Sequence, residues 1–229
     1  DEMEQMELKD PWEVVPLASV PEGANILDST WAFKRKRYPD GRVRKLKARF
    51  CVRGDQQIEG VDFFDTYAPV VGWSTVRLLL ILSVILGLAT KQVDYTLAFV
   101  HADIDSEVYV RMPKLFEKPG HVYKLKKSVY GLRQAPLNFF LCLKDGLEAR
   151  GFVQSKYDPC LFVSDKVVCL CYVDDCLFFS RSEEDIDEVI GSLRRPEPMK
   201  FDLNIEEDVA GFLGILMQRK EDGSIELVQ

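Results

Sequence analysis

The 229-residue chain is poor in the side chains that most often carry metal or nucleophile chemistry. It has two histidines, and its six cysteines include no Cys-x-x-Cys pair and no histidine at ligand spacing. A zinc site built on such spacing is therefore not expected. The sequence predicts reduced thiols in an intracellular compartment, with Cys171 and Cys176 as small core residues.

Long apolar runs are also missing. A membrane-spanning helix needs about 20 apolar residues, and the strongest apolar stretch, residues 78–89, is shorter. The acidic N-terminal residues 1–6 lack the basic and then apolar pattern of a secretory signal. We therefore expect no membrane partner. Residues 78–89 predict a buried helix that begins near Ser74 and Thr75 and packs on both sides.

Composition predicts a folded protein. Hydrophobic residues make up 47% of the chain and charged residues 29%, which suits one sizeable core or two small ones. The net charge of −7 argues against a general nucleic-acid binder. Basic residues nevertheless crowd residues 34–53, where Asp40 is the only acid, and acids gather at 183–188 and 206–208. The basic block predicts a phosphate-binding surface, and a solvated hairpin with charged faces is the alternative.

Two adjacent carboxylates, Asp174 and Asp175, interrupt an apolar run that extends from residue 167 to residue 179. Side chains alternate along a strand, so neighbouring acids share a face only if the chain turns between them. The pattern predicts a β-hairpin with both acids at its tip, although a plain acidic turn has the same signature. Asp94 lies in a second β-prone stretch, residues 92–100, so two strands can bring three acids to one ion.

Such a group of acids suits one kind of chemistry. Carboxylates are ligands for Mg²⁺, and two ions about 3.5–4 Å apart can activate an attacking hydroxyl and stabilise the leaving oxygen in phosphoryl transfer. Mn²⁺ takes the same ligands. This chemistry needs neither histidine nor cysteine.

Residues 172–175 read Tyr-Val-Asp-Asp, which is the YxDD signature of reverse transcriptases and is a weak match on its own. Other blocks typical of the family follow in fixed order, at residues 31–36, 47–49, 68–71, 94–99, 125–136, 158–161 and 212–215. The chain therefore resembles the copia-type retrotransposon reverse transcriptases from about residue 12 to residue 229. This resemblance implies an α+β fold of the DNA and RNA polymerase superfamily, with an antiparallel palm sheet backed by helices.

The resemblance also implies a domain plan. Fingers, at about 12–93 and 108–137, would alternate with palm, at about 94–107 and 138–229, and the thumb and RNase H domains would be absent. It assigns catalysis and the binding of two Mg²⁺ ions to Asp94, Asp174 and Asp175, with the Tyr95 backbone carbonyl as a further ligand.

Two groups of binding residues are implied in the same way. An aromatic ring at position 99 would lie beneath the sugar and exclude ribose, although a core aromatic is the alternative. The residues implied for the incoming nucleotide are Lys34, Lys36, Arg49, Phe99, Tyr130 and Gly131. Those implied for template and primer are Lys126, Lys127, Arg133, Gln134, Pro136, Tyr172, Leu213 and Gly214.

Turn signals predict two hairpins besides the acidic one. Residues 31–37 and 42–53 read as strands joined by a turn that contains Asp40-Gly41. Residues 212–216 and 225–228 read as a final hairpin, which the resemblance makes the primer-positioning hairpin.

Capping signals predict two helices. One begins at Pro136 and runs to about Arg150, with Gly151 as its C-cap. The other follows Ser182, which has an acid three residues on, and ends at Pro196.

The function that the resemblance implies is RNA-directed DNA polymerisation on an RNA or DNA template with a primer and deoxynucleoside triphosphates. Integrase and RNase H domains of a longer polyprotein are the expected partners, within a cytoplasmic virus-like particle. The alternative is an inactive or truncated remnant that only binds nucleic acid or a partner, which the missing thumb and the unusual residues 194–198 favour. A nucleotide cyclase is disfavoured by the full series of blocks.

Overall fold

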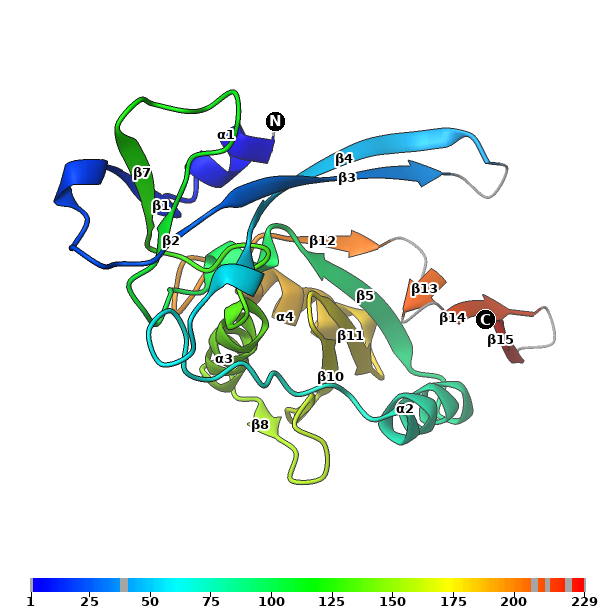
Figure 1. Ribbon diagram of the computed structural model, residues 1–229. Coiled ribbons are helices and arrows are strands. Elements are labelled where there is room, and N and C mark those ends of the chain that lie inside the picture. The colour runs from blue at the N-terminus through cyan, green and yellow to red at the C-terminus, as the bar shows by residue number, and fades with distance from the viewer. Residues whose placement is uncertain (1, 38–40, 207–209, 213–214, 221–223, 229) are drawn as a thin grey trace. The chain divides into compact units, whose positions relative to one another are not determined.

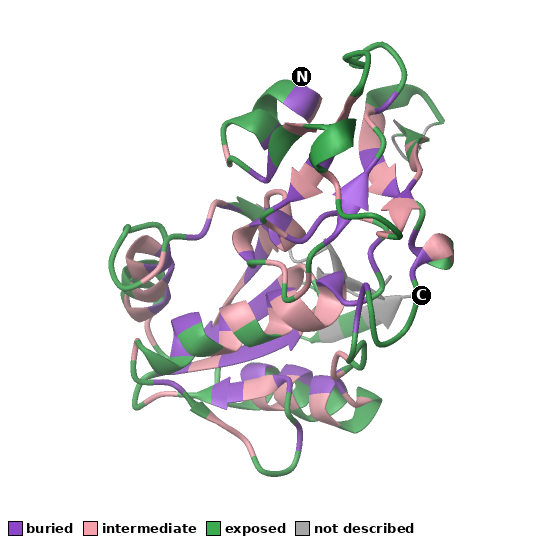
Figure 2. Cartoon of the chain, turned by 60° about the vertical axis from the view of Figure 1, so that its left-hand side comes forward, coloured by how far each residue is buried: buried purple, intermediate pink, exposed green. Residues whose placement is uncertain are grey.

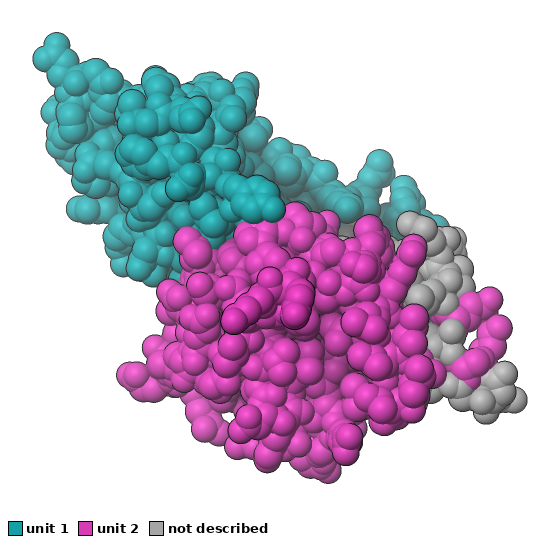
Figure 3. Space-filling view, turned by 90° about the horizontal axis from the view of Figure 1, so that it is seen from below, with its two compact units in different colours: residues 1–68, 99–139 teal, residues 69–98, 140–229 magenta. Residues whose placement is uncertain are grey.

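The computed structural model describes residues 2–37, 41–206, 210–212, 215–220 and 224–228, which form both helices and strands (Figure 1). The chain divides into two compact units, coloured separately in Figure 3. The first unit comprises residues 1–68 and 99–139, and the second comprises 69–98 and 140–229. No helix among the described residues is long and apolar enough to span a membrane. The residue limits of fingers and palm stay a prediction.

A six-stranded antiparallel sheet forms the centre of the second unit, in the order β12-β5-β11-β10-β9-β8. Most residues of its two middle strands are buried, and the buried ones lie on both faces of the sheet (Figure 2). The strands are β5 (Ala89–Tyr95), β8 (Val153–Gln154), β9 (Leu161–Val163), β10 (Val167–Tyr172), β11 (Asp175–Ser180) and β12 (Leu203–Glu206).

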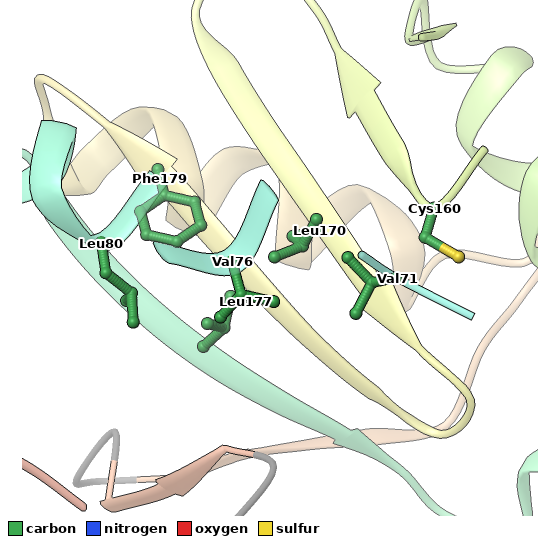
Figure 4. Packing of buried hydrophobic residues seen from close by; sticks show 7 residues of the cluster. All are labelled: Val71, Val76, Leu80, Cys160, Leu170, Leu177 and Phe179. Atoms are coloured by element: carbon green, nitrogen blue, oxygen red, sulfur yellow. The ribbon is translucent and has the colours of Figure 1, made fainter. Parts of the chain in front are cut away.

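Helix α2 (Trp73–Ile85) covers one face of this sheet. Val76 and Leu80 of the helix pack with Leu170, Leu177 and Phe179 of the β10–β11 hairpin, as Figure 4 shows. Side chains alternate along a strand, so every second residue of each strand reaches this core. Helix α4 (Glu183–Leu193) packs against β11 and β5, behind the hairpin in the same view.

The prediction that α2 packs on both sides was wrong. Leu78, Ile81 and Ile85 are each more than half exposed, and they form an apolar stripe along the helix. The helix also begins earlier than expected, with Gly72 as its N-cap. The Asp158 carboxylate accepts hydrogen bonds from the Gly72 N–H and the Thr75 hydroxyl at this end of the helix.

Two other helix ends confirm their predicted caps. Ser182 precedes α4, and its side chain accepts a hydrogen bond from the Glu184 N–H. Helix α3 (Ala135–Glu148) carries Pro136 in its first turn. It ends with Gly151 in the left-handed region, where the Gly151 N–H donates to Glu148 and the Phe152 N–H donates to Leu147. These two bonds form a Schellman motif.

Strand β5 is shorter than the sequence predicted. It ends at Tyr95, and residues Ala98–His101 form a 3₁₀ turn, η3, that includes Phe99. Leu97 between them has a φ of +51°, outside the extended region, so the chain leaves the sheet there.

The first unit contains a four-stranded sheet in the order β1-β7-β6-β2 and a separate β3–β4 hairpin. Its pairs are antiparallel except β2 with β6. The elements are α1 (Glu2–Glu7), β1 (Trp12–Pro16), η1 (Leu17–Ser19), β2 (Ile26–Leu27), β3 (Ser29–Arg37), β4 (Val43–Val52), η2 (Gly54–Gln56), β6 (Tyr109–Val110) and β7 (His121–Leu125).

The β3–β4 hairpin confirms the two strands predicted around residues 38–41, of which 38–40 lie outside the described residues. Residues directly opposite in an antiparallel pair share a face. Ala32 opposite Arg49 and Lys34 opposite Lys47 therefore define a cationic face. The other face is aromatic at its base, where Trp31 lies edge-on to Phe50, and Phe50 in turn packs on Trp12.

Near the C-terminus, β13 (Ala210–Phe212), β14 (Ile215–Arg219) and β15 (Ile225–Val228) form a small antiparallel sheet. The pairing of β14 with β15 confirms the predicted final hairpin. Its turn, residues 221–223, lies outside the described residues.

Candidate active site

The acidic hairpin has the predicted form. Strands β10 and β11 pair up to Tyr172 opposite Asp175, so Val173 and Asp174 alone make the turn. Val173 has a φ of +53°, a region that a β-branched side chain rarely adopts. Such strain costs of order 1–3 kcal/mol and concentrates at functional sites. The turn therefore holds Asp174 at some cost to stability.

The third acid comes from the neighbouring strand. Asp94 on β5 lies directly opposite Asp175 on β11, and the Tyr95 N–H donates to the Asp174 carbonyl over 3.0 Å. Opposite residues of an antiparallel pair share a face and have Cα atoms about 4.5–5.5 Å apart. The ladder thus brings Asp94, Asp174 and Asp175 together at one end of the sheet.

The electrostatics of this end favour a cation. The pKa of Asp175 is raised to about 6, chiefly by burial; a hydrogen bond from Gln92 acts to lower it, and the charges of Asp174 and Asp94 add to the rise. The Gln92 amide donates to Asp175 over 3.2 Å. Like charges opposite each other in a ladder are destabilising, and a positive ion relieves that repulsion.

The donor set fits a hard divalent ion. Asp94, Asp174 and Asp175 offer carboxylate oxygens, the ligands that Mg²⁺ and Mn²⁺ prefer. The charges of Asp174 and Asp94 contribute to the raised pKa of Asp175, and a bound ion would offset that contribution. These carboxylates are suitable donors for the ions that the resemblance implies, and the Tyr95 carbonyl stays a predicted ligand.

A second constellation lies within the first unit. The Arg49 guanidinium lies 4.8 Å from the centre of the Tyr130 ring, and the Phe99 ring meets Tyr130 edge-on at 4.8 Å. The Arg49 Nε is buried and has no hydrogen-bond partner among the described residues. The structure therefore places three of the predicted nucleotide residues side by side.

Gly131 follows Tyr130 at a point where two backbones nearly touch. A Cβ added to Gly131 would lie 2.1 Å from the Val52 carbonyl oxygen, and its φ is +94°. The Val52 N–H donates to the Tyr130 carbonyl over 2.8 Å, which fixes this approach. Only glycine fits here.

The predicted lysines lie on β3. Lys34 is exposed on the cationic face, opposite Lys47. The backbone of Lys36 pairs with Lys45, and its side chain lies outside the described part of the structure. Glu2 of α1 is near the same cations: burial raises the pKa of its carboxyl, while Lys47 and Arg49 act to lower it.

Comparison with known proteins decides the family. A family model described as "Reverse transcriptase (RNA-dependent DNA polymerase)" matches residues 10–229. The chain belongs to the reverse transcriptase family. The predicted resemblance to copia-type members is confirmed.

Relatives of this reverse transcriptase domain are retrotransposon polyproteins. The chain is 32% identical over 219 residues to the Pol polyprotein of transposon TNT 1-94 from Nicotiana tabacum, covering 92% of the chain and 16% of the relative. It is 31% identical to that of transposon RE2 from Arabidopsis thaliana, covering 93% and 15%. The Ty1-ER2 Gag-Pol polyprotein of Saccharomyces cerevisiae is 32% identical, covering 85% and 11%. The chain thus spans about one sixth or less of each.

The three cations predicted to bind template and primer already have partners within the first unit, and those of the two lysines are acidic. Lys126 forms an ion pair with Asp10, and Lys127 lies 2.6 Å from Asp103. Arg133 donates to the Gly54 carbonyl over 2.8 Å. A nucleic acid that binds these side chains must compete with contacts inside the first unit.

Gln134 is a different case. Its side chain is fully buried and donates to the Asp62 carbonyl over 2.8 Å, and it accepts a hydrogen bond from Gln57. This position does not favour the predicted contact with template or primer, because the amide is already satisfied and lies away from solvent.

Of the other predicted template and primer residues, Pro136 is half-buried in α3. Tyr172 is half-buried at the end of β10, against the core beneath α2. Leu213 and Gly214 lie outside the described residues.

Sequence reasoning missed two residues beside the acids and one at the start of α2. Gln92 precedes Asp94 by two residues on β5, so both side chains lie on the same face of the strand. This alternation was the sequence signal that could have identified Gln92. Asn204 lies opposite Asp94 on β12, for which the sequence held no signal. Asp158 belongs to a recognised block but had no assigned role. Its carboxylate accepts hydrogen bonds from the Gly72 N–H (3.0 Å) and the Thr75 hydroxyl (2.5 Å) at the start of α2.

Proposed function

We propose that this chain is the polymerase core of a copia-type Pol polyprotein, an RNA-directed DNA polymerase that extends a primer on an RNA or DNA template. The observation that carries the proposal is the register that sets Asp94 opposite Asp175, beside the Asp174 turn. Deoxynucleoside triphosphates are its proposed substrates. Other Pol domains, such as integrase and RNase H, are its proposed partners, because its relatives are polyproteins.

In this proposal Asp94, Asp174 and Asp175 bind two Mg²⁺ or Mn²⁺ ions, with the Tyr95 carbonyl as an additional ligand. When bound, the ions activate the primer 3′-hydroxyl and stabilise the pyrophosphate that leaves. The chain's own residues position the carboxylates through the β5–β11 ladder. Gln92 holds Asp175 by a hydrogen bond, which limits the orientations of that carboxylate.

We also propose that the second unit corresponds to the palm and the β3–β4 hairpin to the fingers. Arg49 and Lys34 would bind the triphosphate, since a guanidinium can bond phosphate through two N–H groups. The contacts of the Arg49 guanidinium and the Phe99 ring with the Tyr130 ring support a nucleotide-binding role. Phe99, next to Tyr130, would exclude ribose.

Primer extension tests the proposal. The wild-type chain, an Asp174→Asn variant and an Asp165→Asn variant are compared on an oligonucleotide-primed RNA template with deoxynucleotides and Mg²⁺. Asp165 is exposed in the turn before β10, so its variant controls for the loss of a charge. We expect extension by the wild type and by Asp165→Asn, and none by Asp174→Asn, with circular dichroism unchanged in all three.

The other outcomes are equally informative. Extension by Asp174→Asn at the wild-type rate would refute the assignment of the site. Absence of extension in all three proteins would favour the alternative, an inactive remnant that binds nucleic acid.

A further inference from the structure

Three cysteine side chains meet beneath the acidic turn, within the second unit. Cys171 on β10 lies directly opposite Cys176 on β11, and Cys169 is two residues earlier on the same face of β10. Each is at most 2% exposed, and all are free thiols. Their sulfur atoms lie within 4.8 Å of one another, and those of Cys169 and Cys171 are 3.7 Å apart.

This spacing suits a thiophilic metal ion. In a tetrahedral site with Zn–S bonds of about 2.3 Å, neighbouring sulfurs lie about 3.8 Å apart. The three thiols therefore already stand near the separation that three ligands of one ion require. The buried Tyr95 hydroxyl lies among the same thiols and can supply an oxygen as a fourth ligand.

The cysteines and the proposed Mg²⁺ ligands do not compete. Side chains alternate along β11, so Cys176 and its neighbour Asp175 point to opposite faces of the sheet. Thiolates select soft or borderline ions such as Zn²⁺ and Cd²⁺, whereas carboxylates select Mg²⁺. The same hairpin thus offers one class of ligand on each face.

We propose that Cys169, Cys171 and Cys176 form a binding site for one thiophilic divalent cation, Zn²⁺ or Cd²⁺, per chain. Binding converts the three thiols to thiolates and releases three protons to the solvent. The ion links β10 to β11 two residues from Asp174, so it reinforces the hairpin at the acidic turn. Sequence spacing rules miss the site, because strand pairing rather than a Cys-x-x-Cys motif brings the ligands together.

Cadmium titration of the reduced, metal-free chain tests the proposal, because thiolate-to-cadmium charge transfer absorbs in the ultraviolet and carboxylates give no such band. We expect the band to saturate at one Cd²⁺ per chain and to persist in excess Mg²⁺. Cys176→Ser should weaken Cd²⁺ binding at least about tenfold, since even outer contacts of a metal site are worth 10–100-fold. Cys51→Ser, in the first unit, is the matched control and should bind as the wild type does.

Thermal unfolding followed by circular dichroism gives a second measurement. Zn²⁺ should raise the Tm of the wild type and of Cys51→Ser, and should leave that of Cys169→Ser unchanged. Absence of the band in the wild type, or an equal band in Cys176→Ser, would overturn the proposal. Neither measurement depends on polymerase activity, so this inference can fail while the proposed function stands.

Discussion

Removal of the Asp158 carboxylate should loosen helix α2 from the sheet. Asp158 is 6% exposed, and it accepts hydrogen bonds from the Gly72 N–H, the Thr75 hydroxyl and the Cys160 N–H. An Asp158→Ala variant leaves these donors without their acceptor and removes a negative charge from the N-terminus of α2. Each orphaned donor costs roughly 1–3 kcal/mol, and partial access of water reduces the sum, so we expect a loss of about 3 kcal/mol.

Hydrogen exchange measures this loss where it occurs. If α2 opens together with the second unit, a loss of about 3 kcal/mol makes the α2 amides exchange about 10²-fold faster. The Asp158→Asn variant keeps one acceptor oxygen, so its loss of stability should be less than half that of Asp158→Ala. Asp165→Asn, in an exposed turn, is the control. If Asp158→Ala left the exchange of residues 76–85 within twofold of the wild type, the capping role would be refuted.

Gly131→Ala should destabilise the chain by about 3 kcal/mol, because its Cβ would overlap the Val52 carbonyl at a positive φ. Gly191→Ala in α4 has open space and should be neutral or slightly stabilising, as urea unfolding would reveal. The pKa of Asp175 is about 6 in the folded chain and 3.8 in the unfolded chain. The folded state therefore binds more protons between these values, and the stability of the metal-free chain should fall as the pH rises from 3.8 to about 6. Mg²⁺ binds the ionised form and should raise the Tm more at about pH 8 than at about pH 5. In Asp175→Asn this difference should shrink, and an unchanged difference would contradict the assignment.

Local sequence patterns were enough to predict the acidic hairpin. The apolar flanks fix β10 and β11, and two adjacent acids between them leave room only for a turn, so Asp174 and Asp175 could be placed from the sequence. Ser182 and Gly151 were predictable for the same reason, since caps depend on neighbours within a few residues.

Contacts between distant segments were not predictable. The start of α2 depends on Asp158, more than 80 residues away. The need for glycine at Gly131 arises from Val52. Apolar periodicity cannot tell a helix covered on both sides from one with an open stripe, because composition does not reveal which neighbours are present. The exposed side of α2 therefore had to be observed.

That open stripe affects how the protein should be measured. Leu78, Ile81 and Ile85 form an exposed apolar surface on the folded protein. A fluorescent dye that reports unfolding by binding exposed hydrocarbon would already be bright before heating, and its signal would change little at the transition. Circular dichroism, which depends on the backbone, is free of this background and should be the standard stability assay for the chain.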